Sequence, residues 1–489
     1  MSFSFAVAIR WVSGWVLAAS TAAFVCTACG GEAPDAPVDP NSMGGGGSEI
    51  TDIDPELLAS EAAWTSCGGR LECRAVEVPV DHTDPDGPKL SIAVMRAPRW
   101  EGHDFRGVIL VNPGGPGASG RPFVEALDAR RAIGVLQGFD LVGFDPRGVG
   151  GSAAVACGGD RYPSDAFESG GVPELVELFA SDARACAESM GPLYDHLGSR
   201  DVVSDMDLIR KALREEQLNF LGASYGTRLG ALYAEMFPEN TRAVVLDGPV
   251  QPSADLGELV VSQVNALVAA VQEFIVDCDA AILICPPAVE DVVNALWIHS
   301  LDRDAEELFS GFWRSNLTQP TGREDIADFL SVYEFFPEIW DDLIDTAPGG
   351  VSSLNGMINQ MVHCTDQSAP ILSESEITVA LADIGARAPA FVTPALAMAS
   401  CTGWTVANNA VANIRTPDAP PLLLVAGEHD ILTPHHFAEE MHAALAGSVL
   451  VSSAHYGHGV PLGNNPCIDD ILDNYFNQLE LPADGTACP

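Results

Sequence analysis

Ser224 lies in the pattern Gly222-Ala223-Ser224-Tyr225-Gly226, between the apolar run LNFL and the amphipathic run TRLGALYAEMF. A GxSxG pattern supports nucleophilic chemistry where a strand turns sharply into a helix. The strained turn lifts the serine Oγ clear of the sheet, and the flanking glycines relieve crowding. Both flanks meet this condition, although a glycine-rich turn without a catalytic role would share the pattern. We therefore predict Ser224 as a nucleophile because suitable partners follow it in the chain.

A serine hydroxyl is a poor nucleophile until a base removes its proton, and the base needs a carboxylate to fix its tautomer. Asp430 ends the run PLLLVAGEHD, and His458 follows SVLVSSAHYGHG. The order Ser, Asp, His predicts a triad of Ser224, Asp430 and His458. Two alternatives stay open: Asp247, in AVVLDGP, as the acid and His455 as the base.

The segment NPGGPGASG, residues 112–120, lacks the GK[ST] of a phosphate loop, so no nucleotide cofactor is expected. Its glycines suit an oxyanion hole made by the amides of Gly115 and Tyr225, the alternative being a turn without donors. In DPRGVGGS, residues 145–152, we expect Arg147, held by an aspartate, to brace this loop, the alternative being contact with a substrate carboxylate. His429, His435 and His436 match no zinc spacing, so no metal is expected.

Eight apolar runs predict the strands that position these residues. From the third run onward they are nearly continuous in apolar residues, as in parallel strands buried on both faces. They are RAVEVPV, KLSIAVMRA, GVILVNPGG, FDLVGFDPRG, LNFLGAS, AVVLDGP, PLLLVAGEHD and SVLVSSAHYGHG. Residues 251–415 have helical patterning and are predicted as a cap inserted between strands six and seven. The core would comprise residues 61–250 and 416–489.

Residues 1–28 contain one arginine, an apolar stretch and small residues, which predicts an export signal. Cys29, after Thr27 and Ala28 and before two glycines, resembles the lipidated cysteine of a bacterial lipoprotein; ordinary cleavage is the alternative. Residues 29–60 are rich in Gly, Pro and acid and are predicted as a flexible tether. No later apolar run reaches the length of a membrane span, so no further span is expected.

Twelve cysteines include Cys26 and Cys29, and the remaining ten predict five disulfides in an exported protein. Sequence alone leaves the connectivity open, but short closures are entropically cheap. These closures pair Cys67 with Cys73, Cys157 with Cys186, Cys278 with Cys285, Cys364 with Cys401, and Cys467 with Cys488.

The formal net charge is −44, which excludes nucleic acid as a partner because the surface would repel phosphates. So acidic a surface fits a soluble exterior enzyme with some attraction for cationic substrates. Most of the carboxylates are expected to serve solubility.

The ordered set NPGGPGASG, GFDPRGVGGS, LGASYGTRLGALYAEMFPENTRAVVLDGP, HCTD, CTGW, LLVAGEHDILTP and YGHG resembles secreted bacterial serine exopeptidases of the tripeptidyl aminopeptidase and prolyl iminopeptidase type. The resemblance covers roughly residues 60–489. It implies an α/β-hydrolase fold with a helical cap, removal of short peptides from N-termini, and the triad Ser224, Asp430 and His458.

Such an enzyme must recognise a free ammonium group, and carboxylates in the cap are the physical means. The candidates are Glu334, Glu338, Asp341 and Asp342 in YEFFPEIWDD, and Asp366 in HCTD. An esterase or lipase on the same triad is a second hypothesis, and a catalytically silent surface-binding protein is a third.

Overall fold

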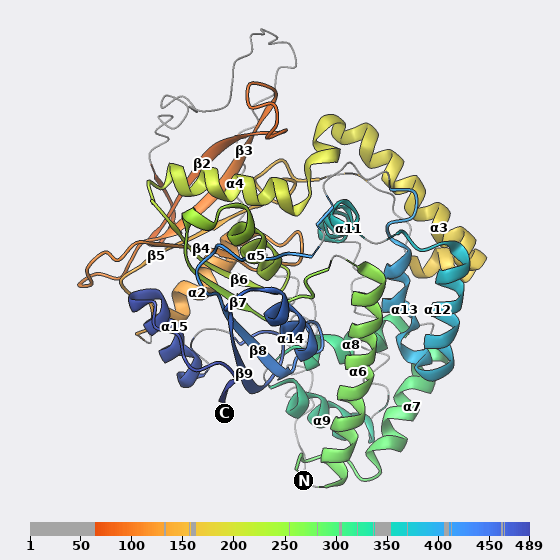
Figure 1. Ribbon diagram of the computed structural model, residues 1–489. Helices are drawn as coiled ribbons and strands as arrows, with labels where there is room; N and C mark the ends of the chain where they lie inside the picture. Colours follow the sequence, from red (N-terminus) through yellow and green to blue (C-terminus); the bar gives the residue numbers. More distant parts are fainter. Residues whose placement is uncertain are drawn as a thin grey trace.

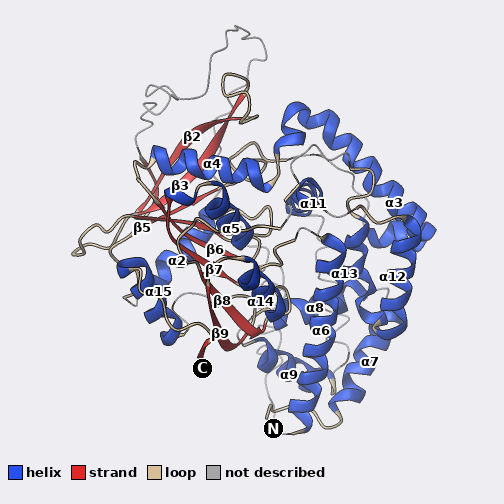
Figure 2. Cartoon of the chain, viewed as in Figure 1, coloured by secondary structure: helices blue, strands red, loops and turns tan. Residues whose placement is uncertain are grey.

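A mostly parallel β-sheet lies at the centre of the structure, a computed structural model (Figures 1 and 2). It describes residues 64–489 except 132–133, 156, 158–162, 254, 281, 303–305, 320, 336, 338–353, 369, 405–409, 412, 461–462 and 464. The predicted signal, the tether and Cys29 lie outside the described residues. Within them the sheet has ten strands in the order β1-β2-β3-β5-β4-β6-β7-β8-β9-β10.

The eight predicted strands are all present, as β2 to β9. The predicted number of eight strands was too low, because β1 and β10 add a short strand at each edge of the sheet. Pairing is parallel from β5 through β4, β6, β7, β8 and β9 to β10, and antiparallel among β1, β2, β3 and β5. The bounds are β1 (Thr65–Gly68), β2 (Leu71–Pro79), β3 (Lys89–Ala97), β4 (Val108–Asn112), β5 (Asp140–Phe144), β6 (Leu218–Ala223), β7 (Thr241–Asp247), β8 (Leu423–His429), β9 (Val449–Tyr456) and β10 (Thr486–Cys488).

The inner strands β4 and β5 are buried along their whole length because both faces of the sheet are covered. In β4, Val108 and Leu110 join one hydrophobic cluster, and Ile109 and Val111 join the other. Helices α4 (Ser199–Ala212), α5 (Gly226–Met236) and α14 (His435–Ala444) contribute to the first cluster. Helices α2 (Gly120–Arg131) and α15 (Pro466–Gln478) contribute to the second. The alternation of side chains along each strand therefore fills two cores, and this is the α/β-hydrolase fold.

Between β7 and β8 the described chain is helical. Its helices are α6 (Leu256–Asp279), α7 (Val289–Asp302), α8 (Glu306–Leu317), α9 (Gly322–Tyr333), α11 (Leu354–Asp366), α12 (Glu374–Arg387), η3 (Pro389–Phe391), α13 (Val392–Ala395) and η4 (Leu396–Ala399). They lie to one side of the sheet (Figure 1). Helix α3 (Pro163–Met190), from between β5 and β6, packs against α12 and η4. The helical side is thus built from two segments, of which the sequence indicated one.

Helix α6 contains the one stretch, among the described residues, that is long and apolar enough to cross a membrane by length and composition. A helix packed in a protein core can pass the same test, so the expectation of no further membrane span stays a prediction. Val260, Val264 and Phe274 of α6 are buried in the protein core. Gln263 Nε2 also donates a hydrogen bond to the Leu432 carbonyl (2.7 Å), which ties the helix to the loop after β8.

All ten cysteines from Cys67 to Cys488 form disulfides, and the pairs are the five short closures. Cys364–Cys401 joins α11 to the segment after η4, and Cys467–Cys488 joins α15 to β10. Such a set is compatible with an exported protein.

Candidate active site

Ser224 occupies the predicted turn from strand to helix. It follows β6, precedes α5 and has φ 56°, in the left-handed region that non-glycine residues rarely adopt. Its amide donates a hydrogen bond to the Asp247 carbonyl (2.8 Å). A Cβ on Gly222 would lie 2.3 Å from the Gly226 carbonyl oxygen, and one on Gly226 would lie 2.7 Å from the Asn112 carbonyl oxygen. Both flanking positions therefore need glycine.

Asp430 and His458 meet at the carboxyl ends of β8 and β9. His458 Nδ1 donates a hydrogen bond to the Asp430 carboxylate, at 2.9 Å from Oδ2 and 3.0 Å from Oδ1. Asp430 is buried and also accepts from the amides of Leu432 (2.8 Å), Thr433 (3.0 Å) and Gly459 (3.0 Å). A proton on Nδ1 leaves His458 Nε2 as the unprotonated nitrogen of a neutral imidazole, which is the state that a general base requires.

The pair shifts the pKa of both partners. Burial alone would raise the pKa of Asp430, but the charge and hydrogen bond of His458 outweigh it and lower the pKa. Burial would lower the pKa of His458, but attraction to the Asp430 carboxylate raises it above the ordinary value. Asp430 is thus held ionised beside an imidazole whose protonated form it stabilises.

The two alternative residues lie elsewhere in the site. The Asp247 carboxylate accepts from the Val460 amide (2.8 Å) and has no hydrogen bond to His458 within the described residues. Burial raises the pKa of Asp247 to about 6. His455 Nε2 is buried without a hydrogen-bond partner in the described part of the chain, and burial lowers the pKa of His455. Asp430 and His458 are therefore the acid and base pair that the geometry favours.

Ser224 Oγ and His458 share no hydrogen bond in the structure, within its described residues. The two are linked through Asp247, whose carbonyl accepts from the Ser224 amide and whose carboxylate accepts from Val460, two residues after His458. Catalytic hydrogen bonds are often long in enzymes without substrate and tighten on binding.

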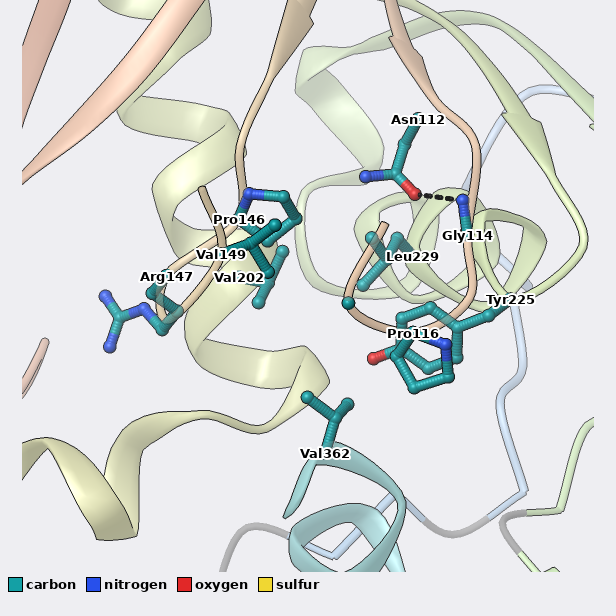
Figure 3. A pocket seen from close by; sticks show the side chains of 11 residues that line it. Asn112, Gly114, Pro116, Pro146, Arg147, Val149, Val202, Tyr225, Leu229 and Val362 are labelled. Atoms are coloured by element: carbon teal, nitrogen blue, oxygen red, sulfur yellow. Dashed lines mark hydrogen bonds between the residues drawn. The ribbon is translucent and has the colours of Figure 1, made fainter. Parts of the chain in front are cut away.

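The loop at residues 112–120 packs directly on the nucleophile turn. A Cβ on Gly114 would lie 2.5 Å from the Ala223 carbonyl oxygen and 2.7 Å from the Tyr225 nitrogen. The Gly114 amide donates to Asn112 Oδ1 (2.8 Å; Figure 3). By contrast, the amides of Gly115 and Tyr225 have no acceptor among the described residues. Two free amides on adjoining turns are what an oxyanion hole requires.

The neighbouring loop at residues 145–152 braces the loop at residues 112–120 through Asp145. The Asp145 carboxylate accepts from the Ser119 hydroxyl and from the Gly151 amide (2.9 Å). Pro116 of one loop and Pro146 of the other also line one small cavity, shown in Figure 3 with Tyr225 and Val362.

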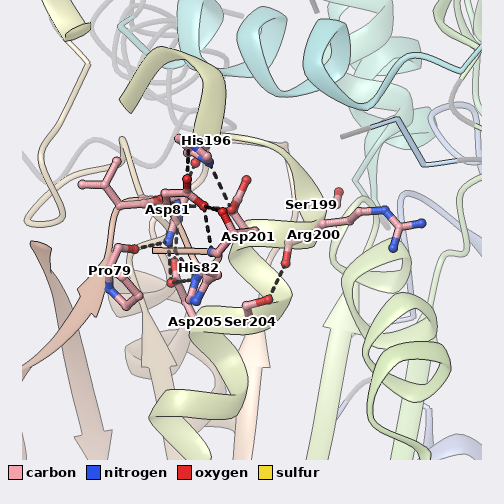
Figure 4. Close-up of polar contacts among 12 residues, drawn as sticks. Pro79, Asp81, His82, His196, Ser199, Arg200, Asp201, Ser204 and Asp205 are labelled. Atoms are coloured by element: carbon pink, nitrogen blue, oxygen red, sulfur yellow. Dashed lines mark hydrogen bonds and ion pairs between the residues drawn. The ribbon is translucent and has the colours of Figure 1, made fainter. Parts of the chain in front are cut away.

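Arg147 was expected to make this brace, and the structure places it elsewhere. The guanidinium is buried and binds both oxygens of Asp205 on α4, at 2.8 and 2.6 Å. It also donates to the His196 carbonyl (2.9 Å). Figure 4 shows the surrounding cluster, in which His82 contacts Asp205 (2.9 Å). Arg147 therefore joins the loop at residues 145–152 to α4. Because its guanidinium bonds to groups of the protein itself, we interpret Arg147 as a structural residue.

The predicted ammonium-binding carboxylates have three different positions. Glu334 lies exposed just after α9, whereas Glu338, Asp341 and Asp342 lie outside the described residues. Asp366 is buried and accepts from the Ser199 amide (2.7 Å), the Ser199 hydroxyl (2.5 Å) and the Tyr225 hydroxyl (3.4 Å). These bonds occupy both carboxylate oxygens, which argues against a substrate contact by Asp366.

Sequence reasoning missed Glu273 of α6, because it lies in an otherwise ordinary amphipathic helix. Its carboxylate accepts from the Tyr456 hydroxyl (2.9 Å) and pairs with His429 Nδ1 (3.3 Å). The His429 and Tyr456 rings stack at 3.9 Å, and the Arg323 guanidinium covers the Tyr456 ring at 4.4 Å. His429 precedes Asp430, so this cluster joins the helical segment to both strand ends.

The remaining predicted histidines take part in local contacts. His435 Nε2 lies 2.8 Å from the Ser452 hydroxyl, and the His436 ring contacts Phe437. His363 of α11 was also missed; its ring stands edge-on to Tyr225 at 6.1 Å, and burial lowers its pKa to about 3.

Comparison with known proteins assigns the chain to a family. The TAP-like protein family matches residues 388–488, and the α/β hydrolase fold family matches residues 107–329. Tripeptidyl aminopeptidase of Streptomyces coelicolor is 30% identical, over 84% of this chain and 83% of its own. Serine protease Hip1 and Carboxylesterase B of Mycobacterium tuberculosis are 28% and 29% identical, each over 88% of this chain and 91% of its own. The chain belongs to the tripeptidyl aminopeptidase family of α/β-hydrolase serine peptidases.

Proposed function

We propose that this protein is an exopeptidase that releases short peptides or single residues from free N-termini, with the triad Ser224, His458 and Asp430. The observation that carries the proposal is the bond from His458 Nδ1 to Asp430 (2.9 Å). Ser224 is held at φ 56°, beside two amides that have no acceptor among the described residues. The names of two relatives, tripeptidyl aminopeptidase and serine protease, support peptide substrates.

The residues would act in two steps. His458 Nε2 removes the proton from Ser224 Oγ as that oxygen bonds to the substrate carbonyl carbon, and the amides of Gly115 and Tyr225 stabilise the oxyanion. His458 then gives the proton to the leaving amine as the C–N bond breaks. Water, activated by the same imidazole, releases the acyl group from Ser224. This chemistry needs no cofactor.

Residues 251–415 would form the cap over a core made of residues 61–250 and 416–489. Three hydrogen bonds support this division, since each joins the 251–415 segment to a loop of the site. The Thr318 carbonyl accepts from the His458 amide (3.0 Å), Asn359 Nδ2 donates to the Pro116 carbonyl (3.0 Å), and Asp366 accepts from Tyr225 (3.4 Å).

Recognition of the N-terminal ammonium is assigned to Glu334 together with Glu338, Asp341 and Asp342. These carboxylates lie in one segment of the proposed cap, and Glu334 is exposed at its start. An ammonium beside a carboxylate is favourable, whereas an unpaired buried carboxylate is costly.

We also propose that the protein is exported, with residues 1–28 as signal, Cys29 as a lipidated anchor and residues 29–60 as tether. The five disulfides support an oxidising compartment. Mass spectrometry of the mature N-terminus tests this part: a diacylglyceryl group on Cys29 is expected, and an unmodified N-terminus would contradict it.

The exopeptidase proposal is tested with peptide p-nitroanilides that have a free or an acetylated N-terminus. We expect acetylation to lower kcat/KM by roughly tenfold to a thousandfold, the scale of about 1.4 to 4 kcal/mol for a lost charge-assisted contact. Equal cleavage of both forms would contradict the proposal. A carboxylesterase is the second candidate, because one relative is named Carboxylesterase B. Such an enzyme would cleave esters but neither peptide.

A further inference from the structure

Arg314 lies on the last turn of α8, close to the proposed base. Four residues further along the chain, the Thr318 carbonyl accepts a hydrogen bond from the His458 amide (3.0 Å). Thr318 directly follows α8, so Arg314 lies in the last helical turn before this contact. The loop of His458 also packs closely here, since a Cβ on Gly457 would lie 3.2 Å from the Thr318 carbonyl oxygen.

The Arg314 side chain is exposed, whereas its neighbours Trp313 and Leu317 are buried. Surrounding protein nevertheless displaces enough water to lower the pKa of Arg314, and its charge opposes the rise in the pKa of His458. The charge of Arg314 thus acts on the proposed base. Its guanidinium still carries a full charge at neutral pH.

The Arg314 guanidinium has no carboxylate partner within the part of the chain that the structure describes. Two other arginines of the helical segment are paired: Arg323 with Asp277 (2.6 Å) and Arg387 with Asp383 (2.9 Å). Carboxylates are abundant in a chain of net charge −44. Because Arg314 is exposed, lies beside the proposed base and pairs with no carboxylate of the described residues, it is available to an anionic ligand.

The position near His458 indicates which part of a substrate the charge would meet. The base delivers its proton to the leaving amine, so groups around His458 lie near the leaving half of the peptide. The acidic surface repels an anionic leaving peptide at long range, and a local cation would offset this at the site.

We propose that Arg314 binds a carboxylate of the leaving peptide and makes the enzyme prefer substrates that are anionic just after the cleaved bond. This specificity rests on the proposed exopeptidase function. The carboxylate has two possible sources: the C-terminus of a leaving group one residue long, or an Asp or Glu side chain in a longer one. Arginine suits either, because its planar fork binds both carboxylate oxygens.

The test uses two substrate pairs that differ by one charge. The first pair ends one residue beyond the cleaved bond, as free acid or carboxamide. The second is longer, amidated, and has Glu or Gln after the cleaved bond. In at least one pair we expect the anionic member to have about a tenfold higher kcat/KM, which is about 1.4 kcal/mol. Arg314→Gln should bring this ratio close to one, and Arg314→Lys should retain part of it.

Arg387→Gln is the matched control, because Arg387 is exposed on α12 and already paired, and this variant should keep the wild-type ratio. Two outcomes overturn the proposal: no charge preference in either pair, or a preference that survives in Arg314→Gln. If the wild-type protein cleaves esters but no peptide, the exopeptidase proposal has failed separately. Arg314 is then tested by inhibition of ester hydrolysis with dialanine and its amide. Dialanine should inhibit the wild type more strongly than its amide does, and this difference should be absent in Arg314→Gln. Equal inhibition of the wild type by dialanine and its amide would overturn the proposal.

Discussion

Glu273 accepts a hydrogen bond from Tyr456 at 2.9 Å, and this contact joins a helix of the 251–415 segment to the strand that precedes His458. The same carboxylate pairs with His429, the residue before Asp430. The Glu273 side chain thus contacts both strand ends that precede the proposed acid and base. The stacked rings of His429 and Tyr456 hold these two strand ends together.

We predict that Glu273→Ala lowers kcat on a small neutral ester by about tenfold with little change in KM, since the bond to Tyr456 is lost and the loop of His458 loosens. Glu273→Gln should lose less, because its amide oxygen still accepts from Tyr456. Glu258→Ala is the control, as this carboxylate is exposed on the first turn of the same helix. Wild-type kinetics in Glu273→Ala would contradict the prediction.

Asp366→Asn is predicted to destabilise the fold without changing substrate preference. The asparagine retains one acceptor oxygen where the carboxylate used two, and the buried Arg228 loses a neighbouring opposite charge. Chemical denaturation should show a loss of about 2 to 4 kcal/mol. The ratio of kcat/KM for free and acetylated peptides should stay as in the wild type; a collapse of that ratio would restore Asp366 as an ammonium ligand.

The pH dependence of activity should follow His458. The base must be neutral, and Asp430 holds the pKa of His458 above the ordinary value of 6.5. We therefore expect kcat/KM to rise with pH through a midpoint above 6.5. Asp430→Asn should lower the midpoint of this pH profile. It should also lower kcat by about 10⁴-fold. A wild-type midpoint below 6.5 would show that another group titrates.

Stability at acid pH should depend on His363. Its folded pKa is about 3 and its unfolded value 6.5, so the unfolded chain takes up a proton first as pH falls. His363 therefore makes the protein less stable as pH falls from about 6.5 towards 3, by about 2 kcal/mol between pH 7 and 5. The free energy of unfolding of His363→Phe, measured in denaturant at pH 7 and pH 5, should fall less between the two pH values than that of the wild type. An equal fall in both proteins would show that other groups cause the pH dependence.

The predictions from sequence succeeded where the pattern is local. The buried strands and the strand-to-helix turn at Ser224 are each encoded in a few adjacent residues. The five disulfides also followed, because each closes a short loop. These features required no knowledge of how distant segments pack.

Features that depend on distant packing were missed. Arg147 pairs with Asp205 on another helix rather than with Asp145, and composition does not distinguish these carboxylates. Asp366 looked available to a substrate, but its burial depends on how α11 meets α4. The edge strands β1 and β10 are too short for an alternating pattern to mark them.

The central claim is that His458 activates Ser224, and the most direct measurement is the rate of peptide p-nitroanilide hydrolysis by Ser224→Ala. The variant should remain folded, judged by circular dichroism, and lose activity by about 10⁴ or more, because triad residues act as a unit. It should also lose labelling by a fluorophosphonate probe. A folded Ser224→Ala protein with activity near the wild-type level would contradict the account.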